Sequence, residues 1–205
     1  MNSSNRSQLD RELAQLNENI LKLASLVEEA IGSAMQALSE HNIQLAQQII
    51  ANDLEINNIR YQIEEECFRI LATQNPAATD LRQVIAATHI ATELERIGDH
   101  AAGIAELVDR MEGEPSVDTL YQLPKMAKRA QKMIRQSIQA FIARDPEMAE
   151  SVIERDEKLD KQYGKFTAAV MEDFDNIGAG VTVPTYMLWM GHALERIGDR
   201  VTNIA

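Results

Sequence analysis

The chain has 205 residues, of which 45% are hydrophobic, 25% are charged and only 4% are aromatic. A core so poor in aromatic residues has to be built from aliphatic side chains, which favours packed helices over a β-sandwich. The formal net charge of −12 disfavours binding to nucleic acid or to an anionic membrane, because both need clustered Lys and Arg. Cations or a basic protein surface are the partners that such a charge favours.

Targeting signals are missing from the sequence. The first residues, Met1 to Arg6, lead directly into a polar amphipathic pattern, and no run of about 18 apolar residues occurs anywhere. The lone cysteine, Cys67, has no partner for an internal disulfide. It lies in the apolar-periodic stretch 63–71, where we expect a core thiol. We therefore expect a cytoplasmic protein that does not insert into a membrane.

Apolar residues recur at helical spacing along nearly the whole chain. Two such runs are predicted core stripes: Ala87, Ile90, Leu94, Ile97, Ala101, Ile104 and Val108, and then Met187, Met190, Leu194, Ile197, Val201 and Ile204. The pattern predicts six helices, at 8–40, 43–73, 77–111, 118–142, 146–175 and 183–205. Turn and capping signals lie between them: His41-Asn42 as a tight turn, Asn75-Pro76 and Asp145-Pro146 as caps before a helix-opening proline, 111–116 as a linker, and 176–180 as a loop.

The two halves of the chain are similar to each other. The sequence Leu94-Glu-Arg-Ile-Gly-Asp99 recurs unchanged at 194–199, and farther upstream Asp53 and Ile56 align with Asp156 and Leu159 at a shift of 103. Self-similarity of this kind indicates an internal duplication. We therefore predict an all-α fold of two tandem antiparallel three-helix bundles, residues 1–112 and 113–205.

Each repeat carries acidic residues at a spacing that helices disfavour. Glu95 and Asp99, like Glu195 and Asp199, are four residues apart and share a helix face beside the core stripe. Like charges at this spacing destabilise a helix by about 0.2–0.5 kcal/mol. Asp53 on the preceding helix, and its counterpart Asp156 with Asp160, could present carboxylates toward these pairs.

Two readings of these acids remain open on the sequence alone. Arg96 and Arg196 stand three residues before Asp99 and Asp199, so each pair could simply be a solvated surface ion pair. The alternative is a cation site, where an all-carboxylate set would suit Mg²⁺, Ca²⁺, Mn²⁺ or iron. Gly98 and Gly198, both within helices, indicate close approach of either a neighbouring helix or a bound cluster.

Signatures of catalysis are absent. The sequence has no phosphate-binding loop, no dinucleotide fingerprint, no nucleophile elbow and no His-Glu-x-x-His. None of the four histidines recurs between the repeats, and none forms the Glu-x-x-His of di-iron carboxylate bundles. The apolar tract Tyr186–Met190 is more typical of core or a dimer contact than of a cofactor pocket. We expect no enzyme activity.

The segments 74–82 and 92–101, together with the tandem Glu-Arg-Ile-Gly-Asp, resemble the PhoU family over essentially the whole chain. The resemblance implies a dimeric regulator of phosphate uptake and signalling that acts negatively. It implies two partners, the ATPase subunit of the phosphate ABC transporter and a membrane sensor histidine kinase. It also implies multinuclear iron or zinc clusters. Carried over to this sequence, the metal ligands are Glu95, Asp99, Glu195, Asp199, Asp53, Asp156 and Asp160.

This sequence departs from the family pattern at two places. Asn57 stands where the second repeat has Asp160, and Gly103 stands where the second repeat has Asn203. We therefore expect the second site to bind metal more tightly than the first. The rival from another functional class is a carboxylate-ligated metal-binding or iron-storage bundle, which the missing Glu-x-x-His disfavours.

Overall fold

The computed structural model describes residues 3–114, 120–172 and 181–205. Those ranges contain six helices and no strand, which confirms the all-α prediction. The helices are α1 (Ser3–Glu40), α2 (Ile43–Gln74), α3 (Thr79–Asp109), α4 (Leu123–Ala143), α5 (Pro146–Glu172) and α6 (Thr182–Ile204).

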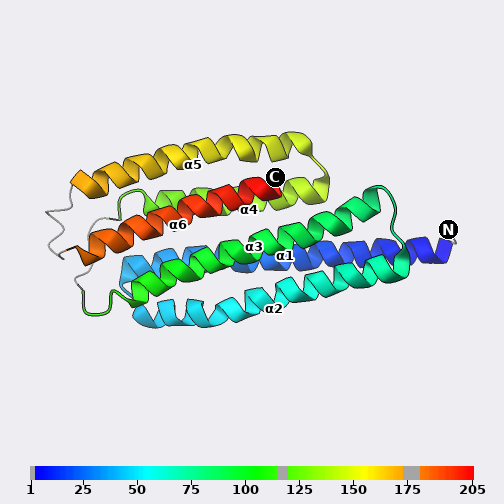
Figure 1. Cartoon of the computed structure of the whole chain (residues 1–205), viewed down its shortest axis with the longest axis horizontal. Helices are drawn as coiled ribbons and strands as arrows, with labels where there is room; N and C mark the ends of the chain where they lie inside the picture. The colour runs from blue at the N-terminus through cyan, green and yellow to red at the C-terminus, as the bar shows by residue number, and fades with distance from the viewer. Residues whose placement is uncertain (1–2, 115–119, 173–180) are drawn as a thin grey trace.

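The helices form two bundles that lie against each other along their length (Figure 1). Helices α1, α2 and α3 pack together, as do α4, α5 and α6, and the bundles meet where α3 contacts α6 and α1 contacts α4. Helices α2 and α5 lie along opposite edges of the molecule (Figure 1). Each edge helix contacts only the two other described helices of its own bundle.

The predicted core stripes are buried. On α3 the stripe consists of Ala87, Ile90, Leu94, Ile97, Ala101, Ile104 and Val108, each exposed by no more than 4%. The α6 stripe is likewise buried from Met187 to Val201, whereas Ile204 at its end is only partly buried. The Cys67 thiol is fully enclosed. In the tract 186–190, Met187 and Met190 face the core, whereas Trp189 is 52% exposed. Aliphatic periodicity therefore located the core correctly.

Of the three signals at 41–42, 75–76 and 145–146, the first and the last are confirmed. Asn42 caps α2 by accepting a hydrogen bond from the Leu45 amide at 3.0 Å, after His41 turns the chain with a φ of 50°. Asp145 caps α5 by accepting from the Met148 amide at 2.9 Å, with Pro146 as the first helical residue. Both repeats thus begin their middle helix with a side-chain cap at aligned positions.

The prediction that Asn75-Pro76 opens a helix is wrong. Asn75 does not open α3 but ends α2 in the left-handed conformation, with a φ of 47°, and α3 begins only at Thr79. Asparagine tolerates this conformation better than most residues, and a proline just beyond a helix end is common. The pair Asn75-Pro76 is therefore a stop signal rather than a start signal.

Some predicted boundaries also shift. Helix α1 begins at Ser3 instead of residue 8, α3 ends at Asp109, and α4 begins at Leu123, after the turn at 121–122, instead of residue 118. Residues 115–116 of the predicted linker, 118–119, 173–175 and the predicted loop 176–180 lie outside the described residues.

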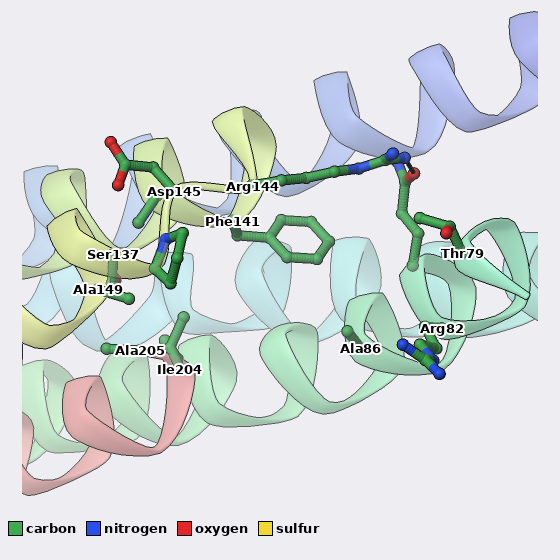
Figure 2. A pocket seen from close by; sticks show the side chains of 13 residues that line it. Thr79, Arg82, Ala86, Ser137, Phe141, Arg144, Asp145, Ala149, Ile204 and Ala205 are labelled. Carbon is green, nitrogen blue, oxygen red and sulfur yellow. Dashed lines mark hydrogen bonds between the residues drawn. The ribbon is translucent and has the colours of Figure 1, made fainter.

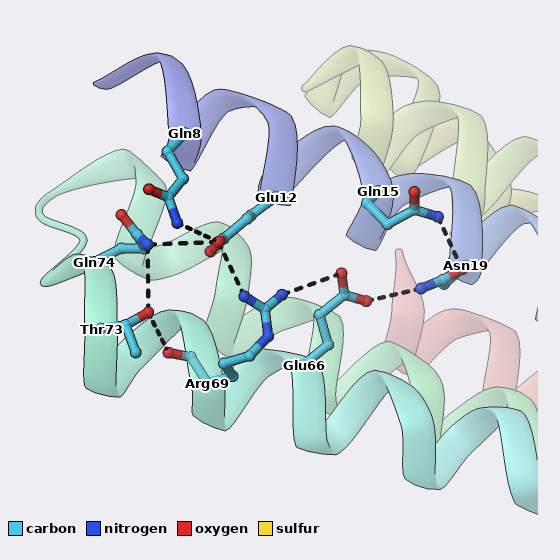
Figure 3. A network of polar contacts seen from close by, with 8 residues as sticks. All are labelled: Gln8, Glu12, Gln15, Asn19, Glu66, Arg69, Thr73 and Gln74. Atoms are coloured by element: carbon cyan, nitrogen blue, oxygen red, sulfur yellow. Dashed lines mark hydrogen bonds and ion pairs between the residues drawn. The ribbon is translucent and has the colours of Figure 1, made fainter. Parts of the chain in front are cut away.

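Polar side chains form hydrogen bonds and ion pairs between α1 and α2 near the N-terminal end of α1 (Figure 3). Arg69 donates to Glu12 at 2.9 Å, and Asn19 donates to Glu66 at 2.7 Å. Arg69 also lies 3.9 Å from Glu66, so one guanidinium lies between two largely buried carboxylates. These contacts fix the register of two long helices.

No helix in the described ranges combines the length and apolar character needed to span a membrane.

Glycine 191 supports a direct test of the tight packing in the second bundle. A methyl group there would lie 2.2 Å from the ring of Phe166, which is fully buried. We expect Gly191→Ala to lower the free energy of unfolding by about 1–3 kcal/mol through overpacking. The measurement is urea unfolding followed by circular dichroism.

The matched control is Gly164→Ala on α5, where an added methyl group meets no atom within 4 Å. Because alanine favours the helix, this variant should gain about 0.5–1 kcal/mol. Equal effects of the two substitutions would contradict the packing described for α5 and α6.

Candidate functional site

A glycine lies at the same place in each bundle, where the last helix crosses the middle one. A methyl group on Gly98 would lie 3.0 Å from Ile56 of α2. A methyl group on Gly198 would lie 2.4 Å from Leu159 and 2.5 Å from Asp156 of α5. Close packing of a neighbouring helix therefore explains both glycines, and the aligned positions Ile56 and Leu159 play the same part.

The first acid cluster consists of Asp53, Glu95 and Asp99. Burial raises the pKa of Asp53 and the Asp99 charge raises it further, while the hydrogen bond that Asn57 donates at 3.0 Å lowers it. Burial followed by the Asp99 charge also raises the pKa of Glu95, against the opposing effect of Arg60. The structure thus brings together the predicted acids of the first repeat.

The second acid cluster consists of Asp156, Asp160, Glu195 and Asp199. Burial raises the pKa of Asp156 to about 6, with further contributions from the charges of Asp160, Asp199 and Glu195. The pKa of Asp160 is raised by burial and then by Glu195 and Asp199. The predicted acids of the second repeat therefore also converge, and their mutual repulsion involves one more carboxylate than in the first cluster.

One oxygen in each cluster is left without a partner. The Oδ1 atoms of Asp53 and Asp156 are buried and receive no hydrogen bond from the described residues. These two aspartates are aligned in the duplication, so both repeats direct the same carboxylate into the helix crossing. An unpaired buried carboxylate oxygen is costly, and a cation or a protein donor would relieve that cost.

The arginines of the two repeats behave differently. Arg196 donates to both oxygens of Glu195, at 2.6 and 2.7 Å, and approaches Asp199 at 2.9 Å. Arg96 turns away from Asp99 and lies 3.7 Å from Glu93. The predicted ion pair at three-residue spacing is thus present in the second repeat, while in the first Arg96 pairs in the opposite direction.

The donor set of each cluster fits a cation that prefers oxygen ligands, but the side chains are not already arranged around one. Among the described residues, no group of three or more His, Cys, Asp or Glu side chains has the arrangement of a metal site. Binding would require the carboxylates to turn toward a common point, and Arg196 would have to release Glu195 and Asp199. The unpaired oxygens of Asp53 and Asp156 are the groups that favour such a rearrangement.

Glu93 is a polar anchor between the bundles that the sequence did not reveal. Asn203 donates to it at 3.2 Å and Arg200 at 3.5 Å, so the carboxylate joins α3 to α6. Asn203 therefore contacts the other bundle instead of adding a ligand to its own cluster. The signal for this role was weak, because Glu93 aligns with Ala193 and the duplication does not repeat it.

Two histidines lie near this junction: His100 is partly buried, and His192 contacts Glu195 of the second cluster. Burial lowers the pKa of His100, and the positive charge of Arg200 lowers it further. His192 is exposed and lies 3.5 Å from Glu195.

A separate cleft of about 460 Å³ lies where the end of α4 and the start of α5 face α3 (Figure 2). Arg144 extends across it and donates to Gln83 at 2.8 Å, which bridges the two bundles. None of the acid-cluster residues lines this cleft.

Two tandem three-helix repeats, each with a glycine crossing beside a carboxylate cluster, define a class of duplicated helical bundle. Comparison with known proteins identifies the family. A family model described as the PhoU domain matches residues 20–108 and 123–205. The chain belongs to the PhoU family.

Individual relatives agree over nearly the full length. Phosphate-specific transport system accessory protein PhoU homologs from Clostridium acetobutylicum and Pseudomonas aeruginosa are 32% and 34% identical. Each comparison covers 97% of this chain, and 91% and 82% of the respective relative.

Two solved structures share the fold, namely PhoU from Pseudomonas aeruginosa and the phosphate transport system regulatory protein PhoU from Streptococcus pneumoniae. Both are 32% identical to this chain, with TM-scores of 0.86 and 0.85. The comparisons cover 95% and 96% of this chain, and 94% and 92% of the solved chains.

The raised pKa of Asp156 makes a prediction about stability in the metal-free protein. Because the folded state holds this proton more tightly than the unfolded chain, the cost of the charge grows as pH rises from 3.8 to about 6 and is complete above that. Asp156→Asn should therefore stabilise the protein at pH 8 by about 1 kcal/mol, after allowance for solvent screening. The gain should shrink as the pH is lowered to 5, as measured by urea unfolding in chelator.

The matched control is Glu157→Gln, on the same helix but exposed and 3.5 Å from Lys161. Its effect should be small at every pH. A gain for Asp156→Asn that stays constant from pH 5 to 8 would show that the buried charge is not its source.

Proposed function

We propose that this chain is a non-catalytic adaptor that lowers phosphate uptake and the phosphate-starvation response when phosphate is plentiful. The observation that carries the proposal is the match to the PhoU family across both repeats, with the acid clusters in corresponding places. The relatives are named accessory proteins of a phosphate-specific transport system. An accessory protein acts through contacts with a transporter, and a cytoplasmic location would give this chain access to one.

The proposed partners are the ATPase subunit of the phosphate ABC transporter and a sensor histidine kinase. Both would be met through complementary charge, because this chain carries a net charge of −12. The acid clusters are candidate contacts, since their partly buried carboxylates have unpaired oxygens that a basic side chain of a partner could satisfy. The homodimer expected from the resemblance is proposed on a separate surface, that of α2.

We further propose that the acid clusters bind iron or zinc, with Mg²⁺, Mn²⁺ or Ca²⁺ as alternatives. Asp53, Glu95 and Asp99 would hold the ion in the first cluster, and Asp156, Asp160, Glu195 and Asp199 in the second. A bound cation would supply the positive charge that these carboxylates lack. We still expect the second cluster to bind metal more tightly than the first, because it has four acids against three. Arg196 neutralises part of that charge.

An iron-storage role is the rival function, and no observation on the described residues favours it. The acids lie at helix crossings beside the core, and the described carboxylates are not preassembled around an ion. Oxygen consumption on addition of Fe²⁺ would distinguish this rival from an adaptor.

The metal proposal predicts unequal effects of matched substitutions. Asp199→Ala should remove more bound iron or zinc than Asp99→Ala, because it acts on the cluster with more carboxylates. Arg196→Gln should increase binding, since it frees Glu195 and Asp199, whereas Arg96→Gln should change little. Elemental analysis and titration of the purified variants provide the measurement, and equal losses from the two alanine variants would reverse the ranking.

The regulatory proposal predicts a defined phenotype in the host organism. Deletion of the gene should raise phosphate uptake and an alkaline-phosphatase reporter of starvation at high phosphate, and the intact chain should restore repression. Asp99→Asn combined with Asp199→Asn should restore it poorly, while the exposed control Glu157→Gln should restore it fully. A deletion that leaves both readouts unchanged would contradict the proposed function.

A further inference from the structure

The outward face of α2 carries large apolar side chains that no described helix covers. Leu54, Tyr61 and Phe68 are 70%, 57% and 54% exposed, and they follow one another at intervals of seven residues. This spacing places all three on one line along the helix. The α2 seam is defined by ten exposed residues: Ala51, Leu54, Glu55, Asn58, Tyr61, Gln62, Glu65, Phe68, Arg69 and Ala72.

The packing of the fold does not explain this seam. Helix α2 contacts only α1 and α3 among the described helices and lies at the lower edge of the molecule (Figure 1). The duplicated helix α5 has Glu157, Lys161 and Gly164 where α2 has Leu54, Asn58 and Tyr61. Phe68 has an apolar counterpart, Met171, which is 60% exposed, but Leu54 and Tyr61 do not. The continuous line of three large apolar side chains is therefore specific to the first repeat.

The α2 seam is complementary to a reversed copy of itself. Leu54 and Phe68 are equally far from Tyr61, and Ala51 and Ala72 are small residues that bracket the seam. Glu55 and Arg69 are each seven residues from Gln62, so reversal places opposite charges together. Asn58, which carries an amide donor, falls opposite Glu65, which carries an acceptor.

We propose that two copies of this chain associate through their α2 seams, packed antiparallel about a two-fold axis near Tyr61 and Gln62. In this arrangement Leu54 packs against Phe68 of the second copy, and Glu55 pairs with its Arg69. Asn58 donates to Glu65 of the second copy. The contact is isologous, so each pairing occurs twice.

The local structure of the α2 seam supports a second copy of the chain as its partner. Arg60 lies over the Tyr61 ring at 4.4 Å and is bonded to Glu64 at 2.6 Å, so the central ring is held in place before association. A shallow groove of about 930 Å³ between α1 and α2 is lined by Tyr61, Gln62 and six other polar or charged residues. It shares five residues with the seam and has room for side chains of the opposing helix; the shared residues are Asn58, Tyr61, Gln62, Glu65 and Arg69.

Charge distribution favours a second copy over an unrelated helix. The Arg69 side chain remains 50% exposed while bonded to Glu12, so its guanidinium can also meet Glu55 of the second copy. A uniformly basic helix would leave Arg69 without an acidic partner across the contact, whereas the reversed seam pairs Arg69 with Glu55. The inference specifies a surface for the homodimer and does not depend on the role in phosphate regulation.

The test is sedimentation equilibrium of the full chain over a range of concentrations. A single helix pair is a small interface, so we expect reversible dimers with a dissociation constant of roughly micromolar order. Leu54→Ser with Phe68→Ser should weaken association at least about tenfold. The control Ile153→Ser removes an apolar residue that is 48% exposed on α5 and should leave association unchanged.

Charge reversal and cross-linking test the orientation. Glu55→Lys should weaken the dimer, because it places lysine opposite Arg69. Under oxidation, Tyr61→Cys should form a disulfide-linked dimer, whereas Leu54→Cys should do so only when mixed with Phe68→Cys. The native Cys67 is buried and does not compete.

Several outcomes would overturn the proposal. These are a chain that stays monomeric at high concentration, a dimer that the seam variants leave intact, or self-linking of Leu54→Cys without linking of Tyr61→Cys. Circular dichroism of each variant separates loss of association from loss of fold. Phosphate regulation is measured independently by the uptake assay, so either proposal can fail while the other holds.

Discussion

The close approach of α3 to α2, and of α6 to α5, is the constraint on which the two acid clusters depend. Only glycine fits at 198 without displacing Leu159 or Asp156, and Gly98 faces Ile56 almost as closely. The same crossings place Asp53 and Asp156 partly out of water, which raises their pKa values. Tight packing and unusual carboxylates therefore have one cause, and a wider crossing would remove both.

Duplication produced equivalent crossings but not equivalent electrostatics. Asn57 donates to Asp53 in the first repeat, whereas its counterpart Asp160 repels Asp156 in the second. Arg196 compensates by bonding to Glu195 and Asp199. The second repeat thus combines a larger concentration of negative charge with a counter-charge of its own, and the first repeat carries less of each.

The helices, the core stripes and the membership of both clusters could be predicted from the sequence, because each rests on periodicity that duplication displays twice. The repeat also aligned Ile56 with Leu159, which the structure places under the two glycines. The features that the sequence predicted wrongly or did not reveal are local ones or ones that occur in only one repeat. Asn75 was assigned to the wrong helix end, since asparagine serves at both ends. Glu93 was missed because only its own bundle carries that carboxylate.

The middle helices show most clearly how the repeats have diverged. Both keep a capped start, a core face and an aspartate at the glycine crossing. Their outward faces are free of that constraint. There α2 exposes Leu54, Tyr61 and Phe68, while α5 has Glu157, Gly164 and Met171 at the aligned positions, so that only Met171 is a large apolar residue. Exposed apolar surface is disfavoured in water unless something covers it. A first repeat that associates and a second that stays solvated would account for a difference that the shared fold does not require.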